Sequence, residues 1–201
     1  MTSETVISTI RHGHTDFNAE KRYAGSLDIS LNAKGVESSR QAAAKMAQAN
    51  YDVVISSALK RAYETAQILT RPGTPILQSP LCNERRFGIM EGLTWEDVLH
   101  LDPPVLMINV GNDLHTVNPQ NGEPFEDLWE RARKFRRMIF RQFRGKKVLV
   151  VSHGVFLQMF HGVLTGSNCI ESLAVYPANL QLTIFQFKGQ QLRSKRIINL
   201  S

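Results

Sequence analysis

Arginine and histidine side chains able to hold and transfer a phosphoryl group follow three short apolar runs of the sequence. They are Arg11 and His12 after the first run, Arg61 after the second and His153 after a later one. A guanidinium group matches the oxygens of a phosphate with two hydrogen bonds, and an imidazole can act as a nucleophile or as a donor. If folding gathers these four residues, their positive charges require an anion, and a phosphoryl group fits them.

The apolar runs have the length of β-strands, and helical patterns separate them. The strand-like runs cover residues 6–10, 53–56, 75–77, 148–152 and 180–187, and the helical patterns cover 33–49, 59–70 and 125–143. This alternation predicts an α/β sheet with helices on both faces. Runs 53–56 and 148–152 are apolar up to a final serine, as expected of central parallel strands. Ligands of such sheets bind beyond the carboxyl ends of the strands, so the four residues are expected to meet there.

Phosphoryl transfer also requires close approach of the backbone and an acid for the leaving oxygen. Gly13 and Gly25 have no side chain, so backbone N–H groups near them can approach a phosphate closely. The segment 81–92 contains Glu84 and Glu91, and either carboxyl group could protonate the leaving oxygen. The residues alone leave that choice open.

The composition indicates one ordinary globular domain. The chain has 201 residues, 42% of them hydrophobic, and its 2 cysteines, Cys82 and Cys169, form no zinc-type cluster and are predicted to be reduced. No segment suits a signal peptide or a membrane span, so a cytoplasmic protein with no membrane partner is expected. His12 and His14 lack a third ligand at a supporting spacing, and neither a metal site nor a cofactor is predicted.

The net charge of +6 is unevenly distributed along the chain. Residues 87–130 contain 9 acidic residues and no Lys or Arg, whereas nine cations fall within residues 131–147. The basic cluster invites a nucleic-acid interpretation. Its apolar residues recur at helical spacing with the cations mainly opposite, so the pattern favours an amphipathic surface helix, and no nucleic-acid partner is expected.

Six segments occur in the order found in one protein family. They are RHGHTDFN (11–18), YAGSLDISLNAKG (23–35), SSALKRAYETA (56–66), LCNERRFGIMEG (81–92), GEPFEDLWER (122–131) and VLVVSHG (148–154). The ordered set resembles the histidine phosphatase superfamily, which has the phosphoglycerate mutase-like fold, and its phosphatase branch in particular. The resemblance implies an α/β three-layer sandwich with a mostly parallel six-stranded sheet and helices on both faces. It further implies a single domain over residues 1–201 with a variable lid at about 87–130.

The resemblance also assigns roles to individual residues. It implies that His12 is the nucleophile that becomes phosphohistidine, that Arg11, Arg61 and His153 hold the transferred oxygens, and that Glu84 rather than Glu91 is the proton donor. Beside Gly13, the positions that line or approach the phosphate in the family are matched here by Asn18, Ala24, Gly25 and Gly154.

These roles predict a metal-independent phosphatase that hydrolyses a small phosphomonoester through a phosphohistidine on His12. The main alternative is a cofactor-dependent phosphoglycerate mutase, because Asn83-Glu84-Arg85 resembles the mutase pattern. A second phosphate on a substrate would require local cations, and residues 87–130 contain none, which disfavours the mutase reaction. A protein phosphohistidine phosphatase and a non-catalytic binder of phosphorylated ligands are further alternatives. The sequence leaves the oligomeric state open.

Overall fold

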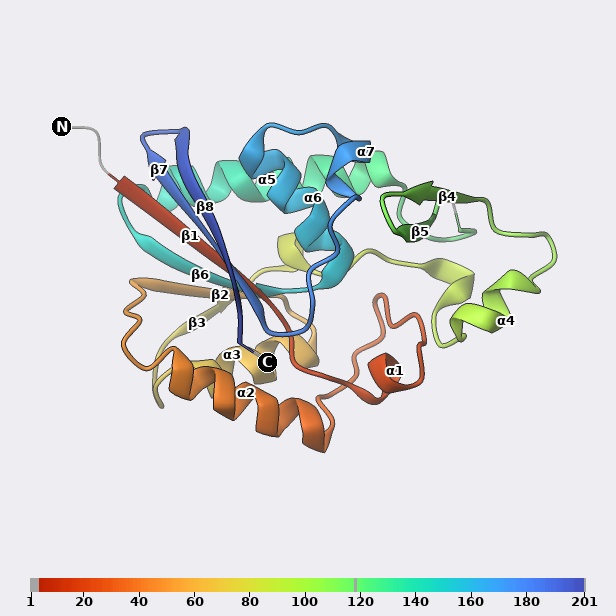
Figure 1. Ribbon diagram of the computed structural model, residues 1–201, viewed down its shortest axis with the longest axis horizontal. Coiled ribbons are helices and arrows are strands. Elements are labelled where there is room, and N and C mark those ends of the chain that lie inside the picture. The colour runs from red at the N-terminus through yellow and green to blue at the C-terminus, as the bar shows by residue number, and fades with distance from the viewer. Residues whose placement is uncertain (1–3, 118, 201) are drawn as a thin grey trace.

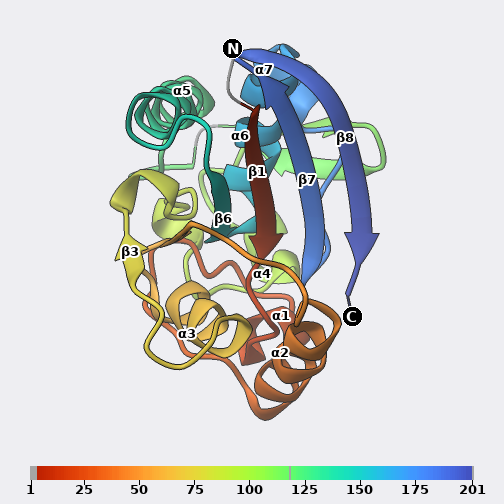
Figure 2. The ribbon, with the colours of Figure 1, turned by 90° about the vertical axis from the view of Figure 1, so that its left-hand side faces the viewer.

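Six strands form one sheet in the order β3-β2-β6-β1-β7-β8 in the computed structural model, which describes residues 4–117 and 119–200 (Figures 1 and 2). The strands are β1 (Glu4–Arg11), β2 (Val53–Ser56), β3 (Ile76–Gln78), β6 (Lys147–Ser152), β7 (Gln181–Lys188) and β8 (Gln191–Asn199). Neighbours β3, β2, β6 and β1 are parallel, and β7 runs antiparallel to both β1 and β8. The predicted mostly parallel six-stranded sheet is therefore confirmed.

Helices cover both faces of the sheet, so the chain forms three layers (Figure 2). On one face lie α2 (Ala33–Lys45) and α3 (Lys60–Leu69), and on the other lie α5 (Phe125–Gln142) and α6 (Gly154–Thr165). The apolar residues of strand β6 contribute to the hydrophobic cores on both faces of the sheet. Val148 and Val150 face α5 and α6, whereas Leu149 and Val151 face α2 and α3. A continuous apolar run is the expected sequence of a strand buried on both sides.

Two elements of the three-layer sandwich were not predicted from the sequence, namely α6 and β8. Helix α6 is apolar on nearly every side, with nine buried residues, and therefore lacks the one-sided period that identifies a surface helix. Strand β8 is an edge strand whose residues are mostly exposed and polar, so it lacks the apolar run of the central strands. Both are recognised only by their pairing or packing partners.

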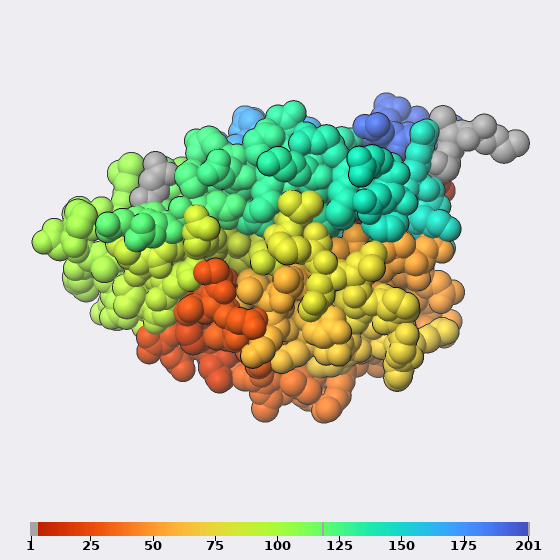
Figure 3. All heavy atoms as spheres, turned by 180° about the vertical axis from the view of Figure 1, so that it is seen from behind, coloured from red at the N-terminus to blue at the C-terminus, as the bar shows by residue number. Residues whose placement is uncertain are grey.

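The predicted lid carries its own small elements and projects from one end of the molecule (Figures 1 and 3). They are α4 (Trp95–Leu99) and the antiparallel pair β4 (Met107–Val110) and β5 (Asp113–Thr116). A 3₁₀ helix at Gly88–Met90 leads into this part, and residue 118 lies outside the described residues. The remaining short helices are α1 (Asp16–Ala19), a 3₁₀ turn at Pro80–Cys82 and α7 (Cys169–Ser172).

Helix α5 has the amphipathic pattern that the sequence predicts. Phe135 and Ile139 are buried, whereas Arg133 and Arg137 on the other side are exposed. Arg131, at the start of the basic cluster, does not share this exposure, because it turns inward and forms an ion pair with Glu123 at 2.7 Å. Among the described residues, no helix combines the length and the hydrophobicity required to cross a membrane.

Phe135 anchors the core between α5 and α6, and we expect its removal to destabilise the fold. Its side chain is fully buried, with the rings of Phe156 and Phe160 centred 5.7 and 5.0 Å away. Phe135→Ala is expected to lower the free energy of unfolding by about 3–5 kcal/mol, because it removes buried surface and leaves a cavity. Urea denaturation measures this change. In the control Trp95→Ala, where the side chain is 57% exposed, a change within about 0.5 kcal/mol is expected, and equal losses in both variants would contradict this packing.

Candidate active site

The carboxyl ends of three neighbouring strands bring four of the predicted residues together. Arg11, the last residue of β1, pairs in register with Ser152, the last residue of β6. The residues that follow these strands are His12 and His153, and their ring centres lie 5.1 Å apart. Strand β2 lies beside β6, and α3 begins shortly after it, which adds Arg61 to the cluster. Parallel pairing thus unites residues that are far apart in the sequence.

His12 has a fixed orientation and an unprotonated ring nitrogen. Its Nδ1 lies 2.7 Å from the carbonyl oxygen of Gly13, and because a carbonyl can only accept, Nδ1 carries the proton and Nε2 a lone pair. The side chain is 4% exposed. Burial, and then the charges of Arg61 and Arg11, hold the pKa of His12 well below its usual range, so the imidazole is neutral at neutral pH. Asn179 Nδ2 donates to the carbonyl of His12 at 2.8 Å and supports this loop.

Arg61 connects α3 to the loop that contains Gly25. Its Nη1 donates to the carbonyl of Leu27 at 2.7 Å and its Nη2 to the carbonyl of Gly25 at 2.8 Å. The side chain is only 1% exposed, and burial lowers its pKa to about 10 despite the opposing charges of Glu84 and Asp28. Arg61 therefore keeps its charge at neutral pH inside the protein.

Arg11 is held by a segment for which the sequence gives no functional signal. Its Nη1 donates to the carbonyl of Pro177 at 3.0 Å, and its guanidinium carbon lies 4.7 Å from the ring centre of Tyr176. Such a stacked arrangement stabilises a cation through the ring quadrupole. Tyr176 and Asn179 lie between α7 and β7 in an irregular segment without a motif, and sequence analysis therefore missed both.

His153 precedes α6 and is bonded to a serine that sequence analysis also missed. Its Nε2 lies 2.7 Å from Ser57 Oγ, and the whole side chain is buried. Burial, followed by the charge of Arg61 and the nearby titratable ring of His12, holds the pKa of His153 well below its usual range. Ser57 lies within the segment 56–66 quoted above, so its position was visible in the sequence although its partner was not.

The structure gives Glu84 and Glu91 different surroundings. Glu84 accepts from the backbone N–H groups of Val155 at 3.2 Å and Phe156 at 3.0 Å, the first turn of α6. A helix N-terminus attracts a carboxylate, and this contact places Glu84 one turn from His153. Glu91 instead accepts from the N–H of Ser26 at 2.8 Å and from its hydroxyl at 2.7 Å, so it supports the loop after Gly25.

Three buried nitrogen atoms of the cluster have no hydrogen-bond partner within residues 4–117 and 119–200. They are Arg11 Nε, Arg61 Nε and His153 Nδ1, out of five such buried polar side-chain atoms in the described part of the chain. An unpaired buried polar atom costs about 1–3 kcal/mol, and such atoms are normally paired. Three of them on residues around one histidine indicate that this place accommodates an anion.

Two of the three predicted binding glycines, Gly13 and Gly25, have different roles in the local structure. The N–H of Gly13 donates to Thr65 Oγ1 at 3.0 Å and its carbonyl meets His12, so both backbone groups are occupied and Gly13 positions His12. Gly25 has a φ of +50°, and a Cβ there would lie 2.1 Å from a carboxylate oxygen of Glu91. Only glycine fits that turn, whose carbonyl then receives Arg61.

The other predicted binding residues border the same cluster. Asn18 lies in the first turn after His12, where its Oδ1 accepts from the N–H of Thr15 at 3.2 Å. Ala24 is half-buried in the loop beside Gly25. Gly154 begins α6, and a Cβ there would lie 2.1 Å from Tyr176 Oη, which shows how closely that ring approaches the helix.

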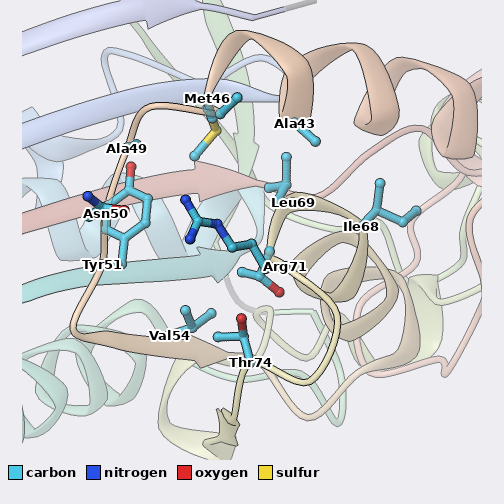
Figure 4. A pocket seen from close by; sticks show the side chains of 12 residues that line it. Ala43, Met46, Ala49, Asn50, Tyr51, Val54, Ile68, Leu69, Arg71 and Thr74 are labelled. Atoms are coloured by element: carbon cyan, nitrogen blue, oxygen red, sulfur yellow. The ribbon is translucent and has the colours of Figure 1, made fainter.

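A cavity of about 440 Å³ lies elsewhere, near the amino ends of β2 and β3. Figure 4 shows the guanidinium group of Arg71 directed between Met46, Tyr51 and Leu69 in this cavity. None of the predicted site residues lines it. Within the described residues, no three His, Cys, Asp or Glu side chains are grouped so that they could hold a metal ion.

The fold and the cluster together define a class of protein. It is an α/β sandwich with a neutral, oriented histidine among two buried arginines and a second histidine at the carboxyl edge of its sheet. Such a site suits transfer of a phosphoryl group, in which positioning and stabilisation of charge dominate.

The chain belongs to the histidine phosphatase superfamily (branch 1), whose sequence profile matches residues 7–200. It is 31% identical to phosphoglycerate mutase-like protein 4 of Arabidopsis thaliana, over 74% of this chain and 66% of that protein. It is 30% identical to the metal-independent phosphoserine phosphatase of the same plant, over 78% of this chain and 67% of that protein. The matched part is about two thirds of the length of these relatives.

The fold of a solved structure agrees with this membership. The α-ribazole phosphatase of Shigella flexneri superimposes with a TM-score of 0.84 at 22% identity, over 96% of each chain. The resemblance stated from the sequence is thus confirmed, and with it the assignment of the chain to the phosphoric monoester hydrolases.

Proposed function

We propose that the protein is a metal-independent phosphatase that hydrolyses a small phosphomonoester through a phosphohistidine intermediate on His12. The observation that carries this proposal is the set of unpaired buried nitrogens on Arg11, Arg61 and His153 around a neutral His12. A tetrahedral phosphoryl group supplies acceptors for the two arginine Nε–H groups, and for His153 Nδ1 once that nitrogen carries a proton, and its phosphorus can then face the unprotonated Nε2 of His12.

In the first step, the lone pair of His12 Nε2 forms a bond to phosphorus while the bond between phosphorus and the ester oxygen breaks. Arg11, Arg61 and His153 stabilise charge on the other oxygens of the phosphoryl group. Glu84 transfers its proton to the departing oxygen, so an alcohol leaves and Glu84 becomes a carboxylate. Asn18, Ala24, Gly25 and Gly154 border the substrate, and Gly13 holds the tautomer of His12.

In the second step, water replaces the histidine on phosphorus. The carboxylate of Glu84 takes a proton from the water, the water oxygen bonds to phosphorus, and the bond to His12 Nε2 breaks with its electron pair returning to nitrogen. Inorganic phosphate leaves, and both His12 and Glu84 return to their initial states.

Metal independence is proposed on electrostatic grounds. The charges of Arg11 and Arg61 lie where a divalent cation would have to approach the phosphoryl oxygens, and like charges repel strongly where water is excluded. These two arginines supply the positive charge that a metal ion supplies elsewhere. The name of the metal-independent phosphoserine phosphatase of Arabidopsis supports the same proposal.

The contacts of Arg85 favour a phosphatase function over a mutase function. In the mutase pattern the arginine after the glutamate contacts substrate, but here the guanidinium group is buried under the lid. Its Nε donates to the carbonyl of Glu123 at 2.8 Å and its Nη1 to that of Thr116 at 2.6 Å, while Nη2 donates to Val117. The group also stacks 3.8 Å from the ring centre of Phe125. Arg85 therefore fastens the lid and is occupied by protein carbonyls.

Replacement of Arg85 is expected to affect stability more than catalysis. Arg85→Met leaves three carbonyls without their donor and should lower the free energy of unfolding by about 2–4 kcal/mol. Below the unfolding transition, kcat/KM for p-nitrophenyl phosphate should stay within about fivefold of wild type. The neighbouring Arg86 is exposed, so Arg86→Met is the matched control for stability. A large rise in KM without a loss of stability would instead indicate contact with substrate.

The test of the proposed function is phosphate release from small phosphomonoesters in excess EDTA. The panel includes phosphoserine, 3-phosphoglycerate and p-nitrophenyl phosphate, with His12→Ala as the control. Release that persists in EDTA and disappears in the variant supports the proposal. Interconversion of phosphoglycerates with bisphosphoglycerate and no release would support a mutase. Release only from a phosphorylated protein would support a protein phosphohistidine phosphatase, and binding without turnover a non-catalytic function.

A further inference from the structure

The tautomer of His153 follows from a chain of hydrogen bonds that leads away from the candidate active site. Ser57 Oγ lies 2.7 Å from His153 Nε2 and 2.9 Å from Asn83 Oδ1. The N–H of Ala58 meets the same Asn83 atom at 2.9 Å, and because an N–H can only donate, that atom is the amide oxygen. The N–H of Leu59 donates to Ser57 Oγ at 3.1 Å.

Only one set of hydrogen positions satisfies the hydrogen bonds that link Asn83, Ser57 and His153. Ser57 Oγ has a single hydrogen, and Asn83 Oδ1 can only accept, so that hydrogen points at Asn83. The contact between Ser57 and His153 then requires a hydrogen from the ring, which places it on Nε2. In a neutral ring the other nitrogen, Nδ1, carries only a lone pair, and this is the buried atom without a partner.

A bare Nδ1 is unsuited to an anion, because its lone pair repels a phosphoryl oxygen. Burial disfavours a positive charge on the ring, and so do Arg61 on α3, His12 and Arg11 at the end of β1, and Arg131 on α5. His153 is therefore neutral before substrate binds. A dianion bound among these cations favours the positively charged ring instead, because its negative charge attracts a proton to Nδ1, the one ring nitrogen that can receive it.

We propose that Ser57 and Asn83 are positioning residues that hold His153 in the Nε2–H tautomer, so that binding of a phosphate-like dianion takes up one proton at Nδ1. This inference rests on the proposed function, since it concerns the same anion site. The proton comes from solvent, the ring becomes imidazolium, and Nδ1 donates to an oxygen of the anion while Nε2 continues to donate to Ser57. Departure of the product releases the proton.

The proposal predicts how anion affinity changes with pH. Sulfate is the probe, because it has the geometry and charge of a phosphate dianion and does not titrate near neutral pH. The measurements use His12→Gln protein, in which His12 cannot contribute a proton. Between pH 6 and 8 the dissociation constant of sulfate should rise about tenfold per pH unit, as binding linked to one proton requires. Nitrogen-15 NMR of labelled histidine should show Nδ1 of His153 bare without sulfate and protonated with it.

Two variants test the role of the hydrogen-bond chain. Ser57→Ala removes the acceptor for Nε2–H, and Asn83→Leu frees the serine hydrogen to donate to Nε2. In both, the neutral Nδ1–H tautomer becomes available, and the pH dependence of sulfate binding should fall to less than about twofold per unit. Ser57→Thr keeps the hydroxyl and should retain the wild-type slope. Asn83 is only half-buried, so its variant provides a test if Ser57→Ala is unstable.

The outcomes separate this inference from the proposed function. A bare Nδ1 that becomes protonated with sulfate, together with flattened slopes in both variants, supports the proposal. A resting ring that already carries Nδ1–H, or sulfate bound to a neutral His153, overturns it while ester hydrolysis by wild-type protein can still stand. Absence of any sulfate effect on the ring also overturns it. Failure of the proposed function would appear separately, as no phosphate release from the ester panel.

Discussion

His12→Ala is expected to lower kcat/KM for small phosphomonoesters about 10⁴-fold or more, the size of effect seen when an enzyme loses its nucleophile. The physical reason is that Nε2 of His12 is unprotonated and is held in one orientation by the bond from Nδ1 to the carbonyl of Gly13. Alanine leaves Arg11, Arg61 and His153 in place, so binding of the ester should weaken much less than turnover. Phosphate release and equilibrium binding of sulfate measure the two effects separately.

The control for this variant is His100→Ala, at an exposed position on the lid side of the molecule, which should leave activity unchanged within about twofold. The intermediate provides a second measurement. Wild-type protein quenched during turnover of a ³²P-labelled ester should carry acid-labile, base-stable label, as expected of phosphohistidine, and His12→Ala should carry none. Label retained by the variant, or turnover within tenfold of wild type, would remove His12 from the mechanism.

Glu84→Gln is expected to cause a loss that depends on the leaving group. For phosphoserine and 3-phosphoglycerate, whose leaving oxygens need a proton, kcat should fall about 10²–10⁴-fold. For p-nitrophenyl phosphate the leaving phenolate departs without a proton, so the first turnover should be nearly as fast as in wild type. Attack of water still needs the carboxylate as base, and the variant should therefore show a burst of p-nitrophenol followed by slow steady-state release.

Two other variants make this result specific to Glu84. Glu96→Gln, at an exposed position of α4, should leave all rates unchanged within about twofold. Glu91→Gln weakens the loop at Ser26 and Gly25, so any loss should be similar for all esters. A burst in Glu91→Gln and none in Glu84→Gln would exchange the roles of the two carboxyl groups.

The helix that carries the basic cluster shows where sequence reasoning was sufficient and where it stopped. The amphipathic period predicted α5 and the exposed side of Arg133 and Arg137, and both are found in the structure. The same period could not identify Arg131 as a partner of Glu123, because that contact depends on how the loop before the helix folds back. Helix α6 was missed for a related reason, since a helix surrounded by protein shows no polar side.

The order of residues along the chain is enough to place arginine and histidine at the ends of the central strands, and therefore to predict that Arg11, Arg61, His12 and His153 meet. This follows because the carboxyl ends of neighbouring parallel strands share one edge of the sheet. The protonation states and hydrogen-bond partners of these four residues depend on how the chain folds. The free nitrogen of His12, the chain from Asn83 through Ser57 to His153, and the occupied guanidinium of Arg85 each depend on contacts between distant segments. Protonation and hydrogen bonding depend on distances of a few ångströms, which residue order alone does not specify.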